Sequence, residues 1–99
     1  MNIKETYTKR GFKSIEFEDS YDTKCHIQQS SITTEPCIWF GIIDAEPKIM
    51  ASKVKEGAVG WISYPIPDDV LLKTEMHLTM EQVKELIPVL QKFADTGEL

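Results

Sequence analysis

The side chains best suited to chemistry are two cysteines and two histidines, namely Cys25, His26, Cys37 and His77. A Cys₂His₂ zinc site needs two close pairs of converging ligands. Cys25 and His26 are adjacent on an expected strand, so their side chains should point to opposite faces of it. We therefore expect buried thiols and polar histidines, and no metal site.

Nucleophilic catalysis would require a pair such as Cys37 with His77. No elbow motif surrounds either cysteine or any serine, and no glycine-rich loop indicates an oxyanion hole. Neighbouring acids occur at Asp68-Asp69 and at Asp19 and Asp22, but in segments that read as solvated turns. The sequence has no glycine pattern typical of a phosphate or dinucleotide site. We expect a protein without catalytic residues or cofactor.

Binding is better supported, because hydroxyl and amide side chains are dense between Gln28 and Thr34. Trp39 follows this segment, and further aromatic residues occur later in the chain. Aromatic rings stack on bases while polar groups read base edges, which is how a nucleotide site is assembled. The simpler interpretation makes Trp39 a core residue and the segment a polar connection. The candidate ligand-binding residues are Gln28, Ser30, Ser31, Trp39, Trp61, Tyr64 and His77.

Composition limits the classes of partner. The chain has 99 residues and a formal net charge of −5, with Arg10 as its one arginine. Binding of nucleic acid would need clustered basic residues, so we expect none beyond a small basic group near Arg10. Residues 1–8 lack the apolar core of a signal peptide, and no apolar run has the length of a membrane span. We expect a cytoplasmic protein with reduced thiols and no membrane contact.

The first half of the chain reads as strands. Residues 1–10 are polar and aperiodic, which predicts a loose arm. Side chains alternate over Phe12–Glu18 and Thr23–Ser30, so these segments should form a hairpin closed by the turn Asp19–Asp22. The apolar run Cys37–Ile43 predicts a central strand buried on both faces, with Gly41 marking a bulge or a close backbone approach.

The second half mixes expected elements. Lys48–Glu56 reads as a short helix that stops at Gly57. Residues 57–66 read as a strand or extended chain, and Pro65-Ile66-Pro67 must be extended because the residue before each proline is excluded from the helical region. Val70–Leu78 reads as the last strand.

A C-terminal helix is the clearest local signal. Thr79 and Gln82 have the spacing of a capping box, with Leu78 and Val83 placed to form a hydrophobic staple. Pro88 should kink the helix and Gly97 should end it. One apolar stripe is predicted from the residues Val83, Leu86, Ile87, Leu90 and Phe93.

These elements predict one α+β domain over residues 1–99. A small antiparallel sheet of about four or five strands should carry the C-terminal amphipathic helix packed on it. Few strands leave sheet edges to protect, and a homodimer is the commonest way to complete a small core. We therefore expect a homodimer or a higher homo-oligomer, with a ligand site between subunits.

Several stretches taken together resemble a family of short proteins encoded by bacteriophages and prophages. The similarity extends over most of the chain from Gly11 onward. It differs from the family pattern by a short region at Ala51–Gly60 and by Glu75, which stands where the family has arginine. The matching stretches are Cys25-His26-Ile27-Gln28-Gln29-Ser30-Ser31, Ile38-Trp39-Phe40-Gly41, Ile49-Met50-Ala51-Ser52, Tyr64-Pro65-Ile66-Pro67, Met76-His77-Leu78-Thr79 and the tail from Glu81 to Leu99.

The resemblance implies a phage accessory protein that acts in a bacterial cytoplasm, and it supplies no reaction. Small phage proteins without enzyme motifs often counter host immunity, some by sequestering a cyclic-nucleotide or cyclic ADP-ribose type of signal. By analogy, the leading hypothesis is a non-enzymatic protein that sequesters a small nucleotide-derived ligand. The alternative is an adaptor or inhibitor that binds a host or phage protein. If the family's arginine binds an anion, Glu75 weakens that binding here.

Overall fold

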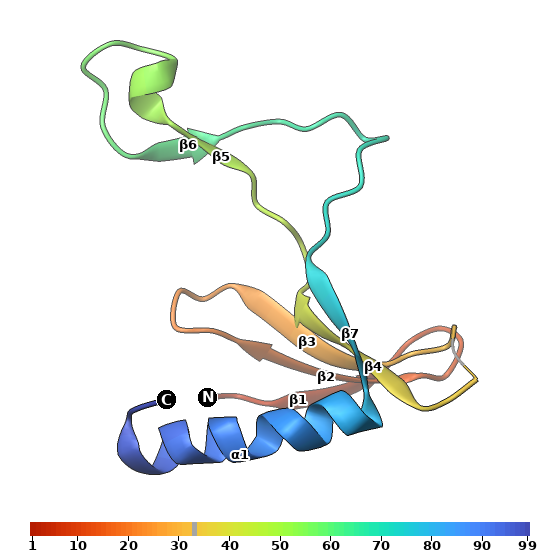
Figure 1. The fold of residues 1–99 in the computed structure, drawn as a ribbon. Coiled ribbons are helices and arrows are strands. Elements are labelled where there is room, and N and C mark those ends of the chain that lie inside the picture. Colours follow the sequence, from red (N-terminus) through yellow and green to blue (C-terminus); the bar gives the residue numbers. More distant parts are fainter. Residues whose placement is uncertain (33) are drawn as a thin grey trace. The chain divides into compact units, whose positions relative to one another are not determined.

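A computed structural model of the chain describes residues 1–32 and 34–99. The chain divides into two compact units. Unit 1 contains Met1–Ile43 and Glu75–Leu99, and unit 2 contains Asp44–Thr74. The elements of both units are labelled in Figure 1.

A five-stranded antiparallel sheet forms the frame of unit 1, with the strand order β1-β2-β3-β4-β7 (Figure 1). A single helix, α1, follows β7 at the C-terminal end. The expected fold class is confirmed: an antiparallel sheet with a C-terminal helix in an α+β arrangement. The strands are β1 (Lys4–Tyr7), β2 (Lys13–Glu18), β3 (Lys24–Gln29), β4 (Cys37–Ile42) and β7 (Glu75–Thr79).

The predicted hairpin is confirmed as β2 and β3. Its turn is held by Asp19, whose Oδ1 accepts hydrogen bonds from the backbone N–H groups of Tyr21 at 2.8 Å and Thr23 at 3.0 Å. Asp22 takes the left-handed conformation with φ of 62°, which short polar residues tolerate. The turn chemistry of aspartate therefore sets the register of the hairpin.

The expectation of a loose arm over residues 1–10 is wrong for Lys4–Tyr7, which form the edge strand β1. Thr8 and Phe12 close the connection, because the Thr8 N–H donates to the Phe12 carbonyl at 2.8 Å. Gly11 permits the reversal with φ of +87°. A short edge strand needs no alternating apolar face, so its sequence carries no period of two.

The two faces of the sheet differ in chemistry, as the register shows. β4 lies between β3 and β7, but only Cys37 in it is fully buried, and Ile38–Ile42 are half-buried. The expectation that β4 is buried on both faces is therefore wrong, because one of its faces belongs to a polar surface. That polar face carries Ser14, Glu16, His26, Gln28, Trp39, Gly41, Glu75 and His77. The apolar face carries Ile15, Phe17, Cys25, Ile27, Ile38, Phe40, Ile42, Met76 and Leu78.

Unit 2 is built on a second, two-stranded sheet of β5 (Lys48–Met50) and β6 (Trp61–Ser63). A single 3₁₀ turn, η1 (Ala51–Lys53), follows β5. The predicted helix over Lys48–Glu56 is therefore wrong, because pairing with β6 provides backbone partners that a short isolated helix would lack. The last strand also starts later than predicted, since the N–H of Val70 donates to the Pro67 carbonyl in a turn.

Helix α1 (Met80–Thr96) confirms the predicted ends. The Gln82 N–H donates to Thr79 Oγ1 at 3.1 Å, and the Thr79 N–H donates to Gln82 Oε1 at 3.0 Å. Gly97 closes the helix with φ of 77°, and its N–H donates to the Phe93 carbonyl. Pro88 lies inside the helix, which continues through it. No helix within residues 1–32 and 34–99 is both long and apolar enough to cross a membrane.

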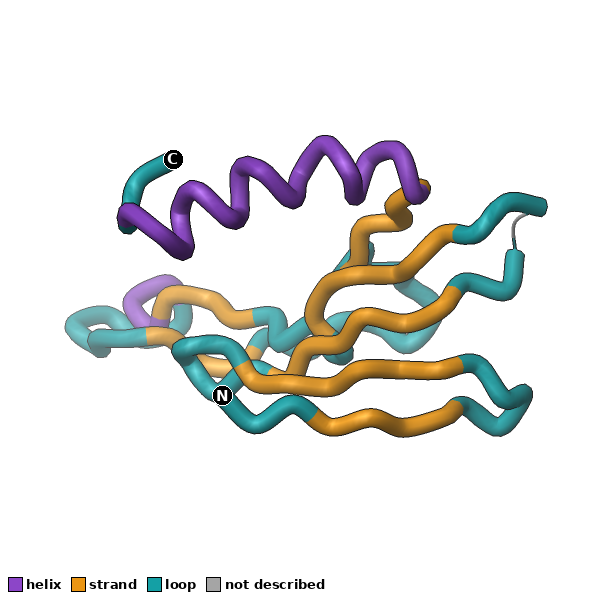
Figure 2. The backbone as a smooth tube through the Cα atoms, turned by 90° about the horizontal axis from the view of Figure 1, so that it is seen from below, coloured by secondary structure: helices purple, strands orange, loops and turns teal. Residues whose placement is uncertain are grey.

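The helix runs along the apolar side of the sheet (Figure 2). At its first turns, Val83 lines the same hollow as Ile38 and Leu78, which project from that face. The opposite, polar face is therefore not covered by the helix.

Candidate functional site

The polar face of the sheet brings together four of the seven predicted binding residues. Gln28, Trp39 and His77 are direct neighbours in one row across β3, β4 and β7. Ser30 follows β3, and its N–H donates to the Cys37 carbonyl at 2.9 Å, which keeps it beside the same sheet face. We call Gln28, Ser30, Trp39 and His77 the Trp39 cluster.

Contacts within the Trp39 cluster orient its aromatic rings. The ring centroids of Trp39 and His77 are 4.2 Å apart, with the planes tilted by 43°. His77 Nε2 is 2.8 Å from the hydroxyl oxygen of Ser30, a hydrogen-bonding distance. Ser30 is 9% exposed, so this bond is largely shielded from water. The imidazole is therefore held at a fixed angle against the indole.

The Trp39 cluster offers one aromatic surface and several neutral polar groups. Gln28, Trp39 and His77 are all half-buried, so each keeps part of its surface open. The amide of Gln28 can both donate and accept hydrogen bonds. This set suits an aromatic, polar and small ligand, because stacking needs no charge and the amide can read a base edge.

The Trp39 cluster contains some, but not all, residues of the polar segment that precedes Trp39. Ser31 is exposed, and the backbone N–H of Ile32 lies 3.4 Å from the Ser30 hydroxyl oxygen. Thr33, which the dense hydroxyl segment includes, lies outside the described residues. Within the described part of the segment, the Ser30 hydroxyl lies at hydrogen-bonding distance from His77.

Trp61 and Tyr64 belong to unit 2, so the Trp39 cluster forms without them. Trp61 lies on β6 and is 66% exposed. The Tyr64 N–H donates to the Pro47 carbonyl at 2.9 Å, just beyond β6. Tyr64 lines a hollow of about 510 Å³ within unit 2, together with Lys48 and Ser63.

A second polar group lies in the neighbouring row of the same face, and sequence reasoning missed it. His26 Nε2 is hydrogen-bonded to Glu75 Oε1, and His26 Nδ1 is 3.5 Å from the Ser14 hydroxyl oxygen. In the register, His26 and Glu75 lie on either side of Gly41. The absence of a side chain at Gly41 leaves room for the two side chains to meet above β4.

Gly41 was the signal that could have located this contact. The sequence predicted a bulge or a close backbone approach at Gly41, but the register runs through it without a bulge and keeps it paired with both neighbouring strands. The contact near the glycine is made instead by the side chains of His26 and Glu75.

Ser14, His26 and Glu75 have the residue types of a catalytic triad, but their geometry favours a structural role. Ser14 is only 4% exposed, so a substrate carbonyl has no path to its hydroxyl. The distance from Ser14 to His26 is also at the limit of a hydrogen bond. The group links β2, β3 and β7 across the sheet, which stiffens the face that carries the Trp39 cluster.

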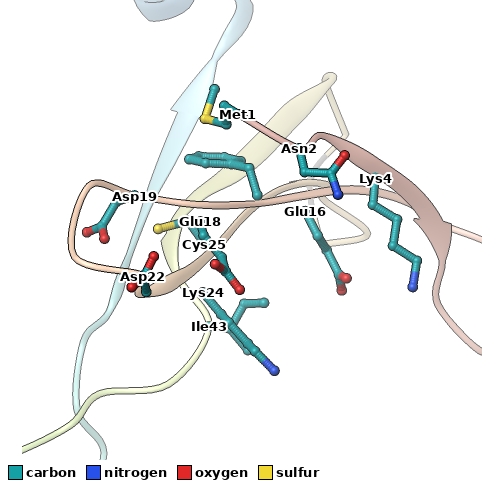
Figure 3. Close-up of a pocket in the computed structure, with 11 residues that line it drawn as sticks. Met1, Asn2, Lys4, Glu16, Glu18, Asp19, Asp22, Lys24, Cys25 and Ile43 are labelled. Atoms are coloured by element: carbon teal, nitrogen blue, oxygen red, sulfur yellow. The ribbon is translucent and has the colours of Figure 1, made fainter.

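A hollow of about 520 Å³ opens at the end of the hairpin, lined in part by Lys4, Glu18, Asp19 and Asp22 (Figure 3). Its charged lining is acidic on balance, because Glu16 and Lys24 complete a set of four carboxylates and two amines. Such a lining disfavours an anionic ligand. We therefore place the candidate ligand site at the Trp39 cluster.

Both cysteines are free thiols and both are buried, as the sequence predicted. Cys25 lies on the apolar face while His26 lies on the polar face, so they cannot share a ligand. Burial, together with the negative charge of Asp19, raises the pKa of the Cys25 thiol above its ordinary value of 9.0. Cys25 is therefore a protonated thiol near neutral pH.

Comparison with known proteins found nothing similar to this chain, so the evidence for its function comes from its own residues and geometry. No protein-family model, no curated protein and no solved structure matches it.

Proposed function

We propose that the protein is a non-enzymatic phage accessory protein that binds and sequesters a small nucleotide-derived ligand at the Trp39 cluster. The observation that carries the proposal is the arrangement of Trp39, His77 and Ser30. The two rings, in contact and tilted to each other, lie on a sheet face that the helix leaves uncovered, and the Ser30 hydroxyl is at hydrogen-bonding distance from the imidazole. Ser14 and Cys37 are both buried, so neither side chain is accessible to a substrate as a nucleophile.

The ligand is recognised chiefly through its base. Stacking on an aromatic side chain contributes about 1–3 kcal/mol per base, without any need for charge. The nearest ionic group on the same face is the His26–Glu75 pair, whose carboxylate repels phosphate. The phosphate groups of a bound nucleotide should therefore point away from Glu75, toward solvent.

Isothermal titration calorimetry against cyclic nucleotides and cyclic ADP-ribose isomers tests the proposal. We expect at least one member of the panel to release measurable heat. Ser30→Ala should weaken its affinity about fivefold, because one oriented hydrogen bond is lost. Ser20→Ala, in the exposed hairpin turn, is the matched control and should leave affinity unchanged. Absence of heat with every member at high protein concentration would count against the proposal.

A protein-binding function is the second candidate, and the surface of unit 2 favours it. Val59 and Leu71 are each 92% exposed, and Trp61 is 66% exposed. Burial of large apolar side chains by a partner stabilises the complex, because apolar surface is removed from water. A tagged chain should then recover one stoichiometric host or phage protein from infected cells. Loss of that partner in Val59→Ser with Leu71→Ser, but not in Ser30→Ala, would support this candidate over ligand sequestration.

A further inference from the structure

Helix α1 carries an apolar stripe that, from Leu86 onward, is about half exposed in the part of unit 1 that the structure describes. No residue of the helix is buried. Leu86 is 40% exposed, Ile87 55%, Leu90 57% and Phe93 53%. A stripe of this kind is normally the face that a helix buries. Its exposure indicates a missing partner surface.

The stripe is free of charge along its length. With 3.6 residues per turn, Glu81, Glu85 and Lys92 fall on the opposite side of the helix. A partner with a charged face would find no ionic complement on the stripe. The chemistry therefore fits an apolar helix of the same kind.

An apolar hollow of about 340 Å³ lies at the N-terminal end of the stripe. It is lined mainly by aliphatic side chains, among them Ile38, Leu78, Met80 and Val83. A cavity of about 150 Å³ already accommodates a benzene-sized ring. The hollow thus has room for one aromatic side chain, and Phe93 is the exposed aromatic side chain of the helix.

We propose that two copies of the chain pair through α1 in antiparallel orientation. The spacing of Val83, Leu86, Leu90 and Phe93 is three, four and three residues, which is the seam of two packed helices. An antiparallel two-fold pair sets Phe93 of each copy against Val83 and the hollow of the other. Leu86 of each copy meets Leu90 of the other. One patch thus supplies both the projection and its receptor, as a two-fold interface requires.

The area available approaches what a specific dimer needs. An aromatic side chain buries roughly 150–250 Å², which is an upper guide for the five large apolar side chains of the helix that are about half exposed, the stripe residues from Leu86 to Phe93 and Met80. Pairing would bury at most roughly 450 Å² per copy, or about 900 Å² in total before the rim of the hollow is counted. A specific interface begins at about 1,000 Å². The polar face remains open in this dimer, so the inference stands independently of ligand binding.

Analytical ultracentrifugation of the full chain tests the pairing. The wild type should sediment as a dimer at micromolar concentration, and Phe93→Glu should sediment as a monomer. The matched control is Tyr21→Glu, an 88% exposed aromatic in the hairpin turn, which should remain dimeric. A monomeric wild type, or a dimer unaffected by Phe93→Glu, would overturn the proposal.

Cysteine cross-linking gives the answer even if Phe93→Glu fails to fold. Copies carrying Leu86→Cys are mixed with copies carrying Leu90→Cys and oxidised. Antiparallel pairing predicts mixed dimers of the two variants, whereas parallel pairing would join Leu86→Cys copies to each other. Glu81→Cys with Glu85→Cys, on the charged side of the helix, should not cross-link. Absence of the mixed dimer would contradict the antiparallel arrangement.

Discussion

At the scale of single residues, Gly41 determines how the polar face is assembled. It lies between His26 and Glu75 in the register, and its missing side chain lets them meet across β4. Their contact is mostly shielded, with 14% of the His26 side chain and 23% of the Glu75 side chain exposed. Trp39 lies two residues earlier on the same strand, so the positions of Gly41 and Trp39 on the polar face are set by the same strand register.

Gly41→Val should destabilise the protein by about 1–3 kcal/mol, because the new side chain overfills the space where His26 and Glu75 meet. Urea unfolding measures the change. In a Glu75→Ala background the penalty should largely disappear, since the space is then vacant and valine favours strands. An equal penalty in both backgrounds would show that the glycine is needed for another reason.

The raised pKa of Cys25 predicts a specific loss of stability in alkali. The folded state holds the thiol protonated above its ordinary pKa of 9.0. The stabilising contribution is therefore complete below pH 9.0 and is lost as the pH rises through the folded-state pKa. Urea midpoints measured from pH 8 to 10.5 should fall less steeply for Cys25→Ser than for the wild type. Parallel slopes would contradict the assigned cause, which is burial aided by Asp19.

At the scale of elements, local sequence chemistry determined the hairpin turn and the C-terminal helix. Asp19 bonds its own turn, and Thr79 with Gln82 satisfies the first N–H groups of α1. These features could be predicted because they depend on residues close in sequence. Strands β1 and β5 could not be predicted in the same way, since neither has an alternating pattern and each exists through pairing with another strand.

The capping box makes a testable contribution to the helix. Thr79→Ala should cost about 0.5–2 kcal/mol, because the Gln82 N–H loses its acceptor. Thermal unfolding followed by circular dichroism measures the loss. Thr79→Ser keeps the hydroxyl and should remain close to the wild type. If both variants lose the same stability, the methyl group of Thr79 and not the cap would be responsible.

At the scale of the whole molecule, unit 1 presents two faces suited to different partners. The polar face carries the Trp39 cluster, and the apolar side carries the stripe of α1 with its hollow. The members of the cluster could be predicted from the sequence, but Trp61 and Tyr64, predicted with them, belong to unit 2. Aromatic residue type alone does not say which sheet a ring belongs to. Strand pairing decides it, and that information is distributed over the chain.

Tryptophan fluorescence during ligand titration is the most direct test of nucleotide binding at the Trp39 cluster. Trp61→Phe leaves Trp39 as the one tryptophan, and Trp39→Phe leaves Trp61. A base that stacks on Trp39 should change the emission of the Trp61→Phe protein in a saturable way. The Trp39→Phe protein should bind more weakly, because the smaller phenyl ring offers less surface for stacking. Unchanged Trp39 emission with a ligand that calorimetry shows to bind would contradict this site.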